Sequence, residues 1–99
     1  MIKVEVTKNN ISILGHANYD DYGKDIVCAA VSSVVQTSVE GIASINESAI
    51  DVKQSQDKLE IIINSNDEIT TKLINNMLNC LKQIEKEYSK NIKIINREE

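Results

Sequence analysis

The sequence has no proline, no tryptophan and no phenylalanine, and only three glycines. Pro-rich or Gly-rich stretches mark most linkers between domains. Because nothing here divides the chain, we expect a single domain over residues 1–99. A chain of 99 residues buries a modest core. A dimer interface that buries further apolar surface would therefore help its stability.

Positive charge is also scarce, since 11 Lys and Arg face 15 Asp and Glu, for a net charge of −4. Binding DNA or RNA by a broad basic surface requires many cations to neutralise phosphates, so we expect no direct nucleic-acid partner. No uninterrupted run of 18 apolar residues exists, so we expect no membrane span. The first residues alternate and carry charges, unlike a signal peptide. Together with the scarcity of cysteine, this predicts a reducing cytoplasm.

Metal-binding side chains are few, because the chain has one histidine, His16, and two cysteines, Cys28 and Cys80. A structural zinc site takes four Cys or His ligands, so we expect no metal and no cofactor. Cys80 lies on the apolar side of a predicted helix. We interpret it as a buried, unreactive thiol.

Hydrophobic periodicity predicts the elements. A helical spacing of apolar residues predicts helices over 26–45 and 68–89, and residues 97–99 are expected to fray. The order β-β-α-β-β-α-β indicates an α+β two-layer sandwich, with two helices on a mixed or antiparallel sheet. Alternation with period two predicts five strands, at 2–6, 11–14, 48–52, 59–63 and 92–95.

The helix predicted over 26–45 is apolar over much of its circumference, so it must be covered on more than one side. We expect the sheet on one side, and the second helix or a partner subunit on another. Gly41 either permits close packing or marks the end of the helix. The expected apolar stripe is Val27, Ala30, Val31, Val34, Ser38 and Ile45, widened by Val35, Val39 and Ile42.

Chemistry-bearing residues gather in GHANYDDYGKDIVC, residues 15–28. His16 follows a predicted strand, and Cys28 lies in the first turn of a helix that Asp25 would cap. Free N–H groups and the positive end of the helix dipole favour a thiolate there, and could contribute to an oxyanion hole. A nearby histidine is the usual partner of such a thiolate. The pair alone leaves a non-catalytic interpretation open, because His and Cys occur together in many non-enzymes.

A third group could orient the imidazole, as in catalytic triads. The candidates in this stretch are Asp20, Asp21 and Asp25. The polar loop between the His16 and Cys28 elements is either a plain connection or a mobile cover over a cleft.

The joint pattern GHA…YGxDIVCAAxS, from Gly15 to Ser32, resembles that of the ribosomal-processing cysteine proteases, a small bacterial family. The similarity extends over the whole chain. It implies an endopeptidase that removes an N-terminal extension, ending in hydrophobic and aromatic residues, from a large-subunit ribosomal protein. It also implies a homodimer. A non-catalytic ribosome-associated binding module of the same fold is the alternative.

By position, the resemblance implies that Cys28 is the nucleophile and His16 the general base. Asp25 and Ser32 match further positions of the motif, where they would support the site by capping, orientation or hydrogen bonding. The gate over the substrate would be the loop formed by Asn18, Tyr19, Asp20, Asp21, Tyr22 and Gly23.

Overall fold

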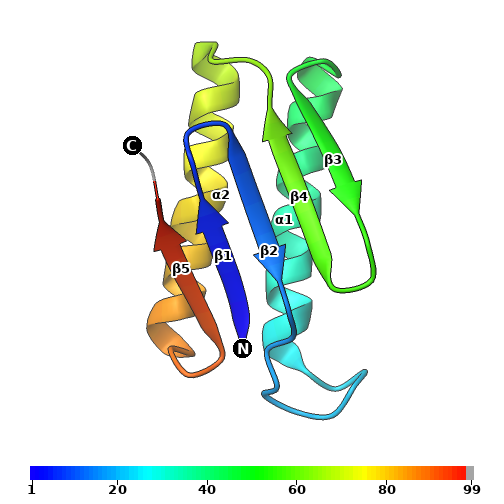
Figure 1. Ribbon diagram of the computed structural model, residues 1–99, viewed down its shortest axis with the longest axis vertical. Helices are drawn as coiled ribbons and strands as arrows, with labels where there is room; N and C mark the ends of the chain where they lie inside the picture. The colour runs from blue at the N-terminus through cyan, green and yellow to red at the C-terminus, as the bar shows by residue number, and fades with distance from the viewer. Residues whose placement is uncertain (98–99) are drawn as a thin grey trace.

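The computed structural model describes residues 1–97, which form one sheet with two helices packed on one of its faces (Figure 1). This arrangement confirms the predicted α+β sandwich and its element order. The elements are β1 (Ile2–Val6), β2 (Asn10–Leu14), α1 (Ile26–Ile45), β3 (Ile50–Gln54), β4 (Lys58–Ile63), α2 (Glu68–Glu87) and β5 (Ile92–Asn96).

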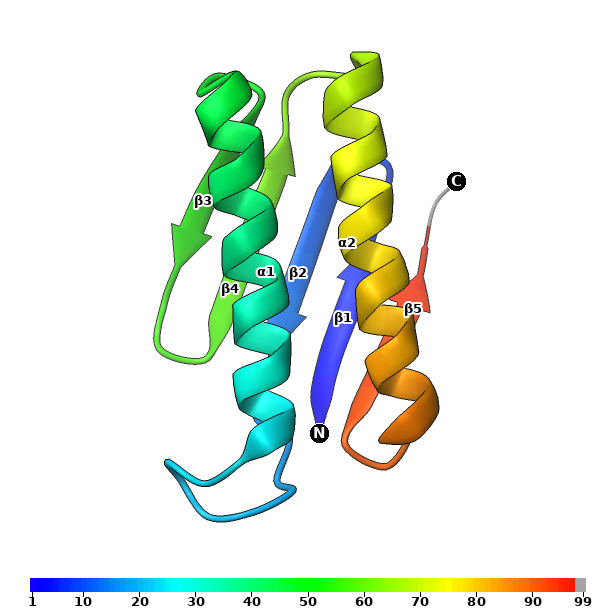
Figure 2. The same cartoon turned by 180° about the vertical axis from the view of Figure 1, so that it is seen from behind.

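The sheet is mixed, with the strand order β3-β4-β2-β1-β5. Strand β1 pairs in parallel with β5, and the other three pairings are antiparallel. Both helices lie on the same face, as the view from behind shows (Figure 2). The loop from β2 to α1 therefore emerges at one end of the molecule, beyond the end of the sheet.

The core lies between the helices and the covered face of the sheet. Each large aliphatic side chain buried there contributes about 1.5–3 kcal/mol of transfer free energy. Its main members are Ile2, Val4, Val6, Ile11, Ile61 and Ile92 from the sheet, Val27, Val31, Val35 and Ile42 from α1, and Ile74, Met77 and Leu81 from α2.

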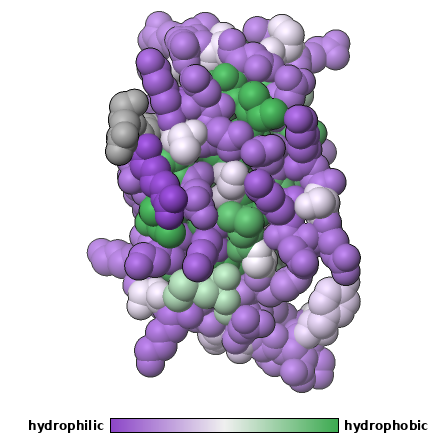
Figure 3. Space-filling view, viewed as in Figure 1, coloured by the Kyte–Doolittle hydropathy of each residue, from purple (hydrophilic) through white to green (hydrophobic). Residues whose placement is uncertain are grey.

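The helix-free face of the sheet is largely hydrophilic, with separate apolar spots (Figure 3). Across it, Glu5 pairs with Ser12, Ser12 with Glu60, and Glu60 with Lys53. An antiparallel sheet can expose one face to water when its side chains alternate in this way.

The third strand was predicted two residues too early. It begins at Ile50 rather than Ser48 and continues through Lys53 and Gln54, which leaves only residues 55–57 for the turn. Lys53 and Gln54 are exposed on an edge strand, where polar side chains are tolerated. Because of this polarity, the sequence KQSQD, residues 53–57, was predicted to be a turn.

The predicted stripe of α1 was also partly wrong. Val27 and Val31 are buried, but Ile45 is 60% exposed at the end of the helix. In α2, Cys80 is half-buried rather than buried. Successive residues lie about 100° apart around a helix. Because its neighbour Leu81 faces the core, Cys80 is turned partly away from it.

By length and composition alone, α1 is apolar enough to cross a membrane, although serines and threonines interrupt its sequence. In this fold its apolar stripe packs into the core, and it lies beside α2 (Figure 2). The core helix of a globular protein meets the same criterion, so this observation does not favour a membrane span.

The expected fraying does not begin at Arg97. Its backbone N–H donates to the Val6 carbonyl at 2.7 Å, which continues the pairing of β5 with β1. The same expectation for residues 98 and 99 lies outside the described residues.

We predict that Gly41→Ala stabilises the protein by about 1 kcal/mol, because glycine is unfavourable inside a helix. Gly41 lies four residues before the end of α1, and a Cβ there meets no described atom within 4 Å. Gly15→Ala is the contrasting variant, since its φ is +84° and a Cβ would lie 2.8 Å from the Met1 carbonyl oxygen. Urea unfolding should show a higher free energy of unfolding for Gly41→Ala and a lower one for Gly15→Ala. A destabilising Gly41→Ala would contradict the prediction.

Candidate active site

A cleft of about 710 Å³ opens where the end of β2, the start of α1 and the β3–β4 turn meet. It brings together most of the residues that the sequence singled out. Tyr19 and Asp21 do not line it. The predicted residues that line it are His16, Asn18, Asp20, Tyr22, Gly23, Asp25, Cys28 and Ser32.

The sulfur of Cys28 rests against the end of the segment that carries His16. The backbone N–H of Ala17, a fully buried residue, points to Cys28 Sγ at an N···S distance of 3.3 Å. The thiol and the imidazole are thus carried by two elements that touch through this N–H.

The imidazole of His16 points toward the β3–β4 turn. Its Nε2 lies 3.3 Å from Oδ1 of Asp57, and both side chains are exposed. In the part of the chain that the structure describes, the ring's hydrogen-bond partner is Asp57 and not Cys28. Catalytic hydrogen bonds are often unformed in a free enzyme and form only with substrate.

Asp25 is the N-cap of α1, as predicted. One carboxylate oxygen accepts from the N–H groups of Val27 and Cys28, both at 3.0 Å. The other accepts from Tyr19 and Asp20, at 2.9 and 3.3 Å. Partial burial alone would raise the pKa of this carboxyl, but these four hydrogen bonds, led by that from Cys28, together lower it below 3.8.

This capping has a consequence for the expected oxyanion hole. The free N–H groups of the first helical turn were its expected donors, and two of them, those of Val27 and Cys28, already donate to Asp25. The N–H of Ala17, beside the sulfur, is the backbone donor that faces the nucleophile in this structure.

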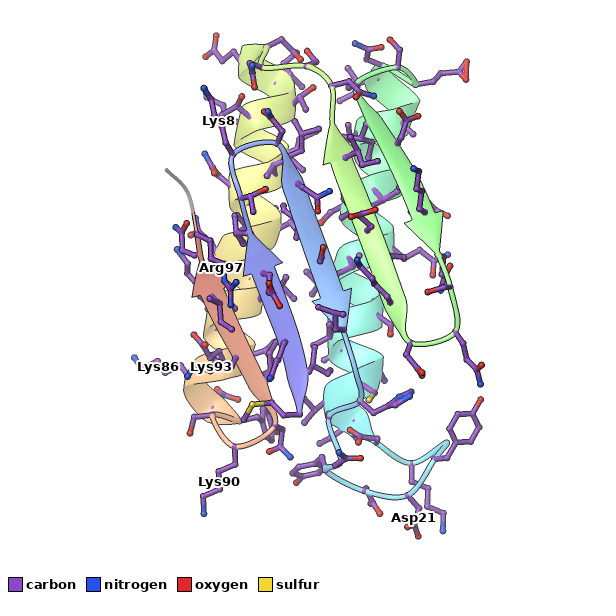
Figure 4. The ribbon with its side chains drawn as sticks, in the orientation of Figure 1. Lys8, Asp21, Lys86, Lys90, Lys93 and Arg97 are labelled. Atoms are coloured by element: carbon purple, nitrogen blue, oxygen red, sulfur yellow. The ribbon has the colours of Figure 1, made fainter. Side chains whose placement is uncertain are left out.

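None of the three predicted orienting aspartates contacts His16 among the described residues. Both carboxylate oxygens of Asp25 accept backbone N–H groups, and Asp20 Oδ1 accepts from the N–H of Asp21 at 2.7 Å. The side chain of Asp21 points away from the body of the molecule (Figure 4). The acid beside His16 is instead Asp57, which the sequence analysis assigned to a polar turn and not to the site.

The loop between His16 and Asp25 is held at its beginning. The Asn91 side chain donates to the Ala17 carbonyl at 3.1 Å. The ring of Tyr19 meets that of Tyr88 edge to face, with centroids 5.3 Å apart. Tyr22, by contrast, is fully exposed. Because Asp25 also holds the N–H groups of Tyr19 and Asp20, the part of the loop available to move over the cleft is residues 21–24.

A second, apolar groove of about 390 Å³ runs along α1. Val35, Val39 and Val52 line it together with residues of the first cleft. Ser32 stands where the two meet, one turn after Cys28. The shared lining residues are Ile13, Val31, Ser32, Gln54 and Leu59, so the cleft and the groove are continuous.

Comparison with known proteins identifies the family. The model of the family described as cysteine protease Prp matches residues 1–93. The chain belongs to the Prp family of cysteine proteases. The ribosomal processing cysteine protease Prp of Staphylococcus aureus is 32% identical over 104 residues, with 95% of this chain and 97% of that protein covered.

Two solved structures of Staphylococcus aureus Prp share the fold closely. The one in complex with a covalently linked product peptide has a TM-score of 0.92 at 29% identity, and covers 98% of this chain and all of that one. The one in complex with a substrate peptide has a TM-score of 0.86 at 28% identity, with the same coverage. Membership of the Prp family makes this protein a cysteine protease that acts on peptides. It disfavours the alternative of a non-catalytic binding module.

We predict that Asp25→Asn lowers the melting temperature at neutral pH and frees the loop, because an amide cannot accept from all four N–H groups. A carboxyl whose pKa is lowered by folding stabilises the fold above its ordinary pKa, and this contribution is lost as pH falls through the folded value. The wild-type melting temperature should therefore fall below about pH 3.8, and that of Asp25→Asn should fall less steeply.

Asp67→Asn is the matched control, since Asp67 caps α2 and its pKa is also lowered. The Asp67→Asn variant should change the pH dependence of the melting temperature in a similar way. It should not expose the loop to proteases. Limited proteolysis within residues 18–24 should be faster only in Asp25→Asn. Equal cutting in both variants would contradict the loop-holding role of Asp25.

Proposed function

We propose that this protein is a cytoplasmic cysteine endopeptidase that removes the N-terminal extension of a large-subunit ribosomal protein. Family membership and the names of its relatives support this substrate. The observation that carries the chemistry is the contact of Cys28 Sγ with the N–H of Ala17, the residue that follows His16, in an open cleft that both Cys28 and His16 line.

The proposed reaction begins with transfer of the Cys28 proton to His16. The thiolate then attacks the scissile carbonyl carbon and forms a tetrahedral intermediate. The negative charge moves from sulfur to oxygen, so the Ala17 N–H, freed from the thiolate, can donate to the oxyanion. Collapse expels the amine, which takes the proton from His16. Water, deprotonated by His16, then attacks the thioester carbonyl. The C–S bond breaks, the peptide acid leaves, and the released Cys28 thiolate takes back the proton from His16.

Substrate selection is assigned to the apolar groove. An extended peptide that reaches Cys28 can continue along α1, where Val35, Val39 and Val52 would hold the hydrophobic and aromatic residues before the cut. The polar loop of residues 21–24 would close over the peptide at the other end of the cleft. Its exposed Tyr22 supports that role, because the ring can pack on a bound chain.

We also propose a homodimer. The core is small, and large apolar side chains remain exposed at Ile26 and Ile45, the two ends of α1. A partner subunit that covers them would remove apolar surface from water. The basic side chains Lys86, Lys90 and Lys93 gather near β5, on the side opposite the loop and its Asp21 (Figure 4).

We predict that Cys28→Ala lowers the cleavage rate at least about 10³-fold, because removing a nucleophile that acts as a unit with its base removes the chemical step. The substrate is the extended ribosomal protein, and mass spectrometry locates the cut after hydrophobic or aromatic residues. Cys80→Ala is the control, because Cys80 lies on α2, outside the cleft, and should retain full activity. Persistent cleavage by Cys28→Ala would contradict the nucleophile assignment.

A further inference from the structure

Asp57 is held opposite His16 by the pairing of β2 with β4. The last residue pair of that ladder is Leu14 with Lys58. One step further, the backbone N–H of Gly15 donates to the carbonyl of Asp57 at 3.0 Å. The β3–β4 turn is therefore an extension of the sheet, and it places Asp57 beside His16 through backbone bonds.

The side chains of His16 and Asp57 also meet. Asp57 Oδ1 lies 3.3 Å from His16 Nε2, and both residues line the cleft that contains Cys28. The carboxylate of Asp25 is occupied by the N–H groups of the loop and the helix. Within residues 1–97, Asp57 is therefore the acid that contacts the imidazole.

We propose that Asp57 is a positioning residue for His16. This inference rests on the proposed function, in which His16 takes the Cys28 proton. A neutral imidazole carries one proton, and an Nε2–H that donates to Asp57 leaves Nδ1 as the basic nitrogen. Asp57 thus holds the ring in one tautomer and stabilises the imidazolium that forms when Cys28 is deprotonated.

The contribution should be modest. The side chains of His16 and Asp57 are 63% and 72% exposed. Exposed ion pairs are weakened by water and screened by salt. We therefore expect Asp57→Asn to lower kcat about three- to tenfold with little change in KM. Asp57→Ala should lower kcat further, because the amide oxygen of asparagine can still accept from Nε2. Asp57→Glu should restore part of the loss.

The experiment measures kcat and KM for cleavage of the extended ribosomal protein at salt concentrations from about 0.05 to about 1 M, which span strong to weak screening. The wild-type advantage over Asp57→Asn should shrink as salt rises. Asp51→Asn is the charge-matched control from the same hairpin, because Asp51 faces Asn64 and does not line the cleft. An unchanged or raised kcat in Asp57→Asn, or an equal loss in Asp51→Asn, would overturn the proposal.

Alkylation of Cys28 by iodoacetamide separates this proposal from the proposed function. If His16 assists Cys28 and Asp57 positions His16, alkylation should slow in His16→Ala and, to a smaller extent, in Asp57→Asn. If alkylation slows in His16→Ala but not in Asp57→Asn, the positioning role of Asp57 is wrong and the endopeptidase assignment stands. Unaltered alkylation and cleavage in His16→Ala would instead overturn the function of His16 itself.

Discussion

The site depends on one carboxylate, that of Asp25. Two oxygens supply about four acceptor positions, and here they satisfy two N–H groups of the first turn of α1 and two of the preceding loop. The start of the helix, the path of the loop and the position of Cys28 are therefore set together. The same carboxylate accepts from the backbone N–H of Cys28, while the Ala17 N–H donates to the Cys28 sulfur.

The second requirement is a sharp turn at the end of β2, which Gly15 allows. Its φ of +84° is accessible to glycine, and any Cβ would collide with the Met1 carbonyl oxygen at 2.8 Å. This turn brings Ala17 under the sulfur and leaves His16 at the mouth of the cleft. The Gly-His-Ala part of the motif thus has a backbone explanation: Gly15 makes the turn, and the buried Ala17 closes the core beneath it.

Local signals made much of this predictable. Alternation, helical spacing and the capping preference of aspartate indicated the element order and the start of α1. Contacts between distant segments were not predictable, because they depend on strand register. Asp57 lies 41 residues from His16 and meets it only through the order of β2 and β4. In KQSQD, where β3 meets its turn, nothing distinguishes that aspartate from an ordinary turn residue.

The exposure of the His16–Asp57 pair limits how strongly the site can act before a substrate is bound. With both side chains in water, the attraction between His16 and Asp57 is weak, and the imidazole is not bonded to Cys28. A peptide that fills the apolar groove along α1 would also cover the adjoining cleft and displace water from it. The lower local dielectric would then strengthen every charge interaction in the site. Binding of the substrate residues remote from the cut would thereby raise the rate of cleavage. A peptide that lacks those residues would be cleaved slowly.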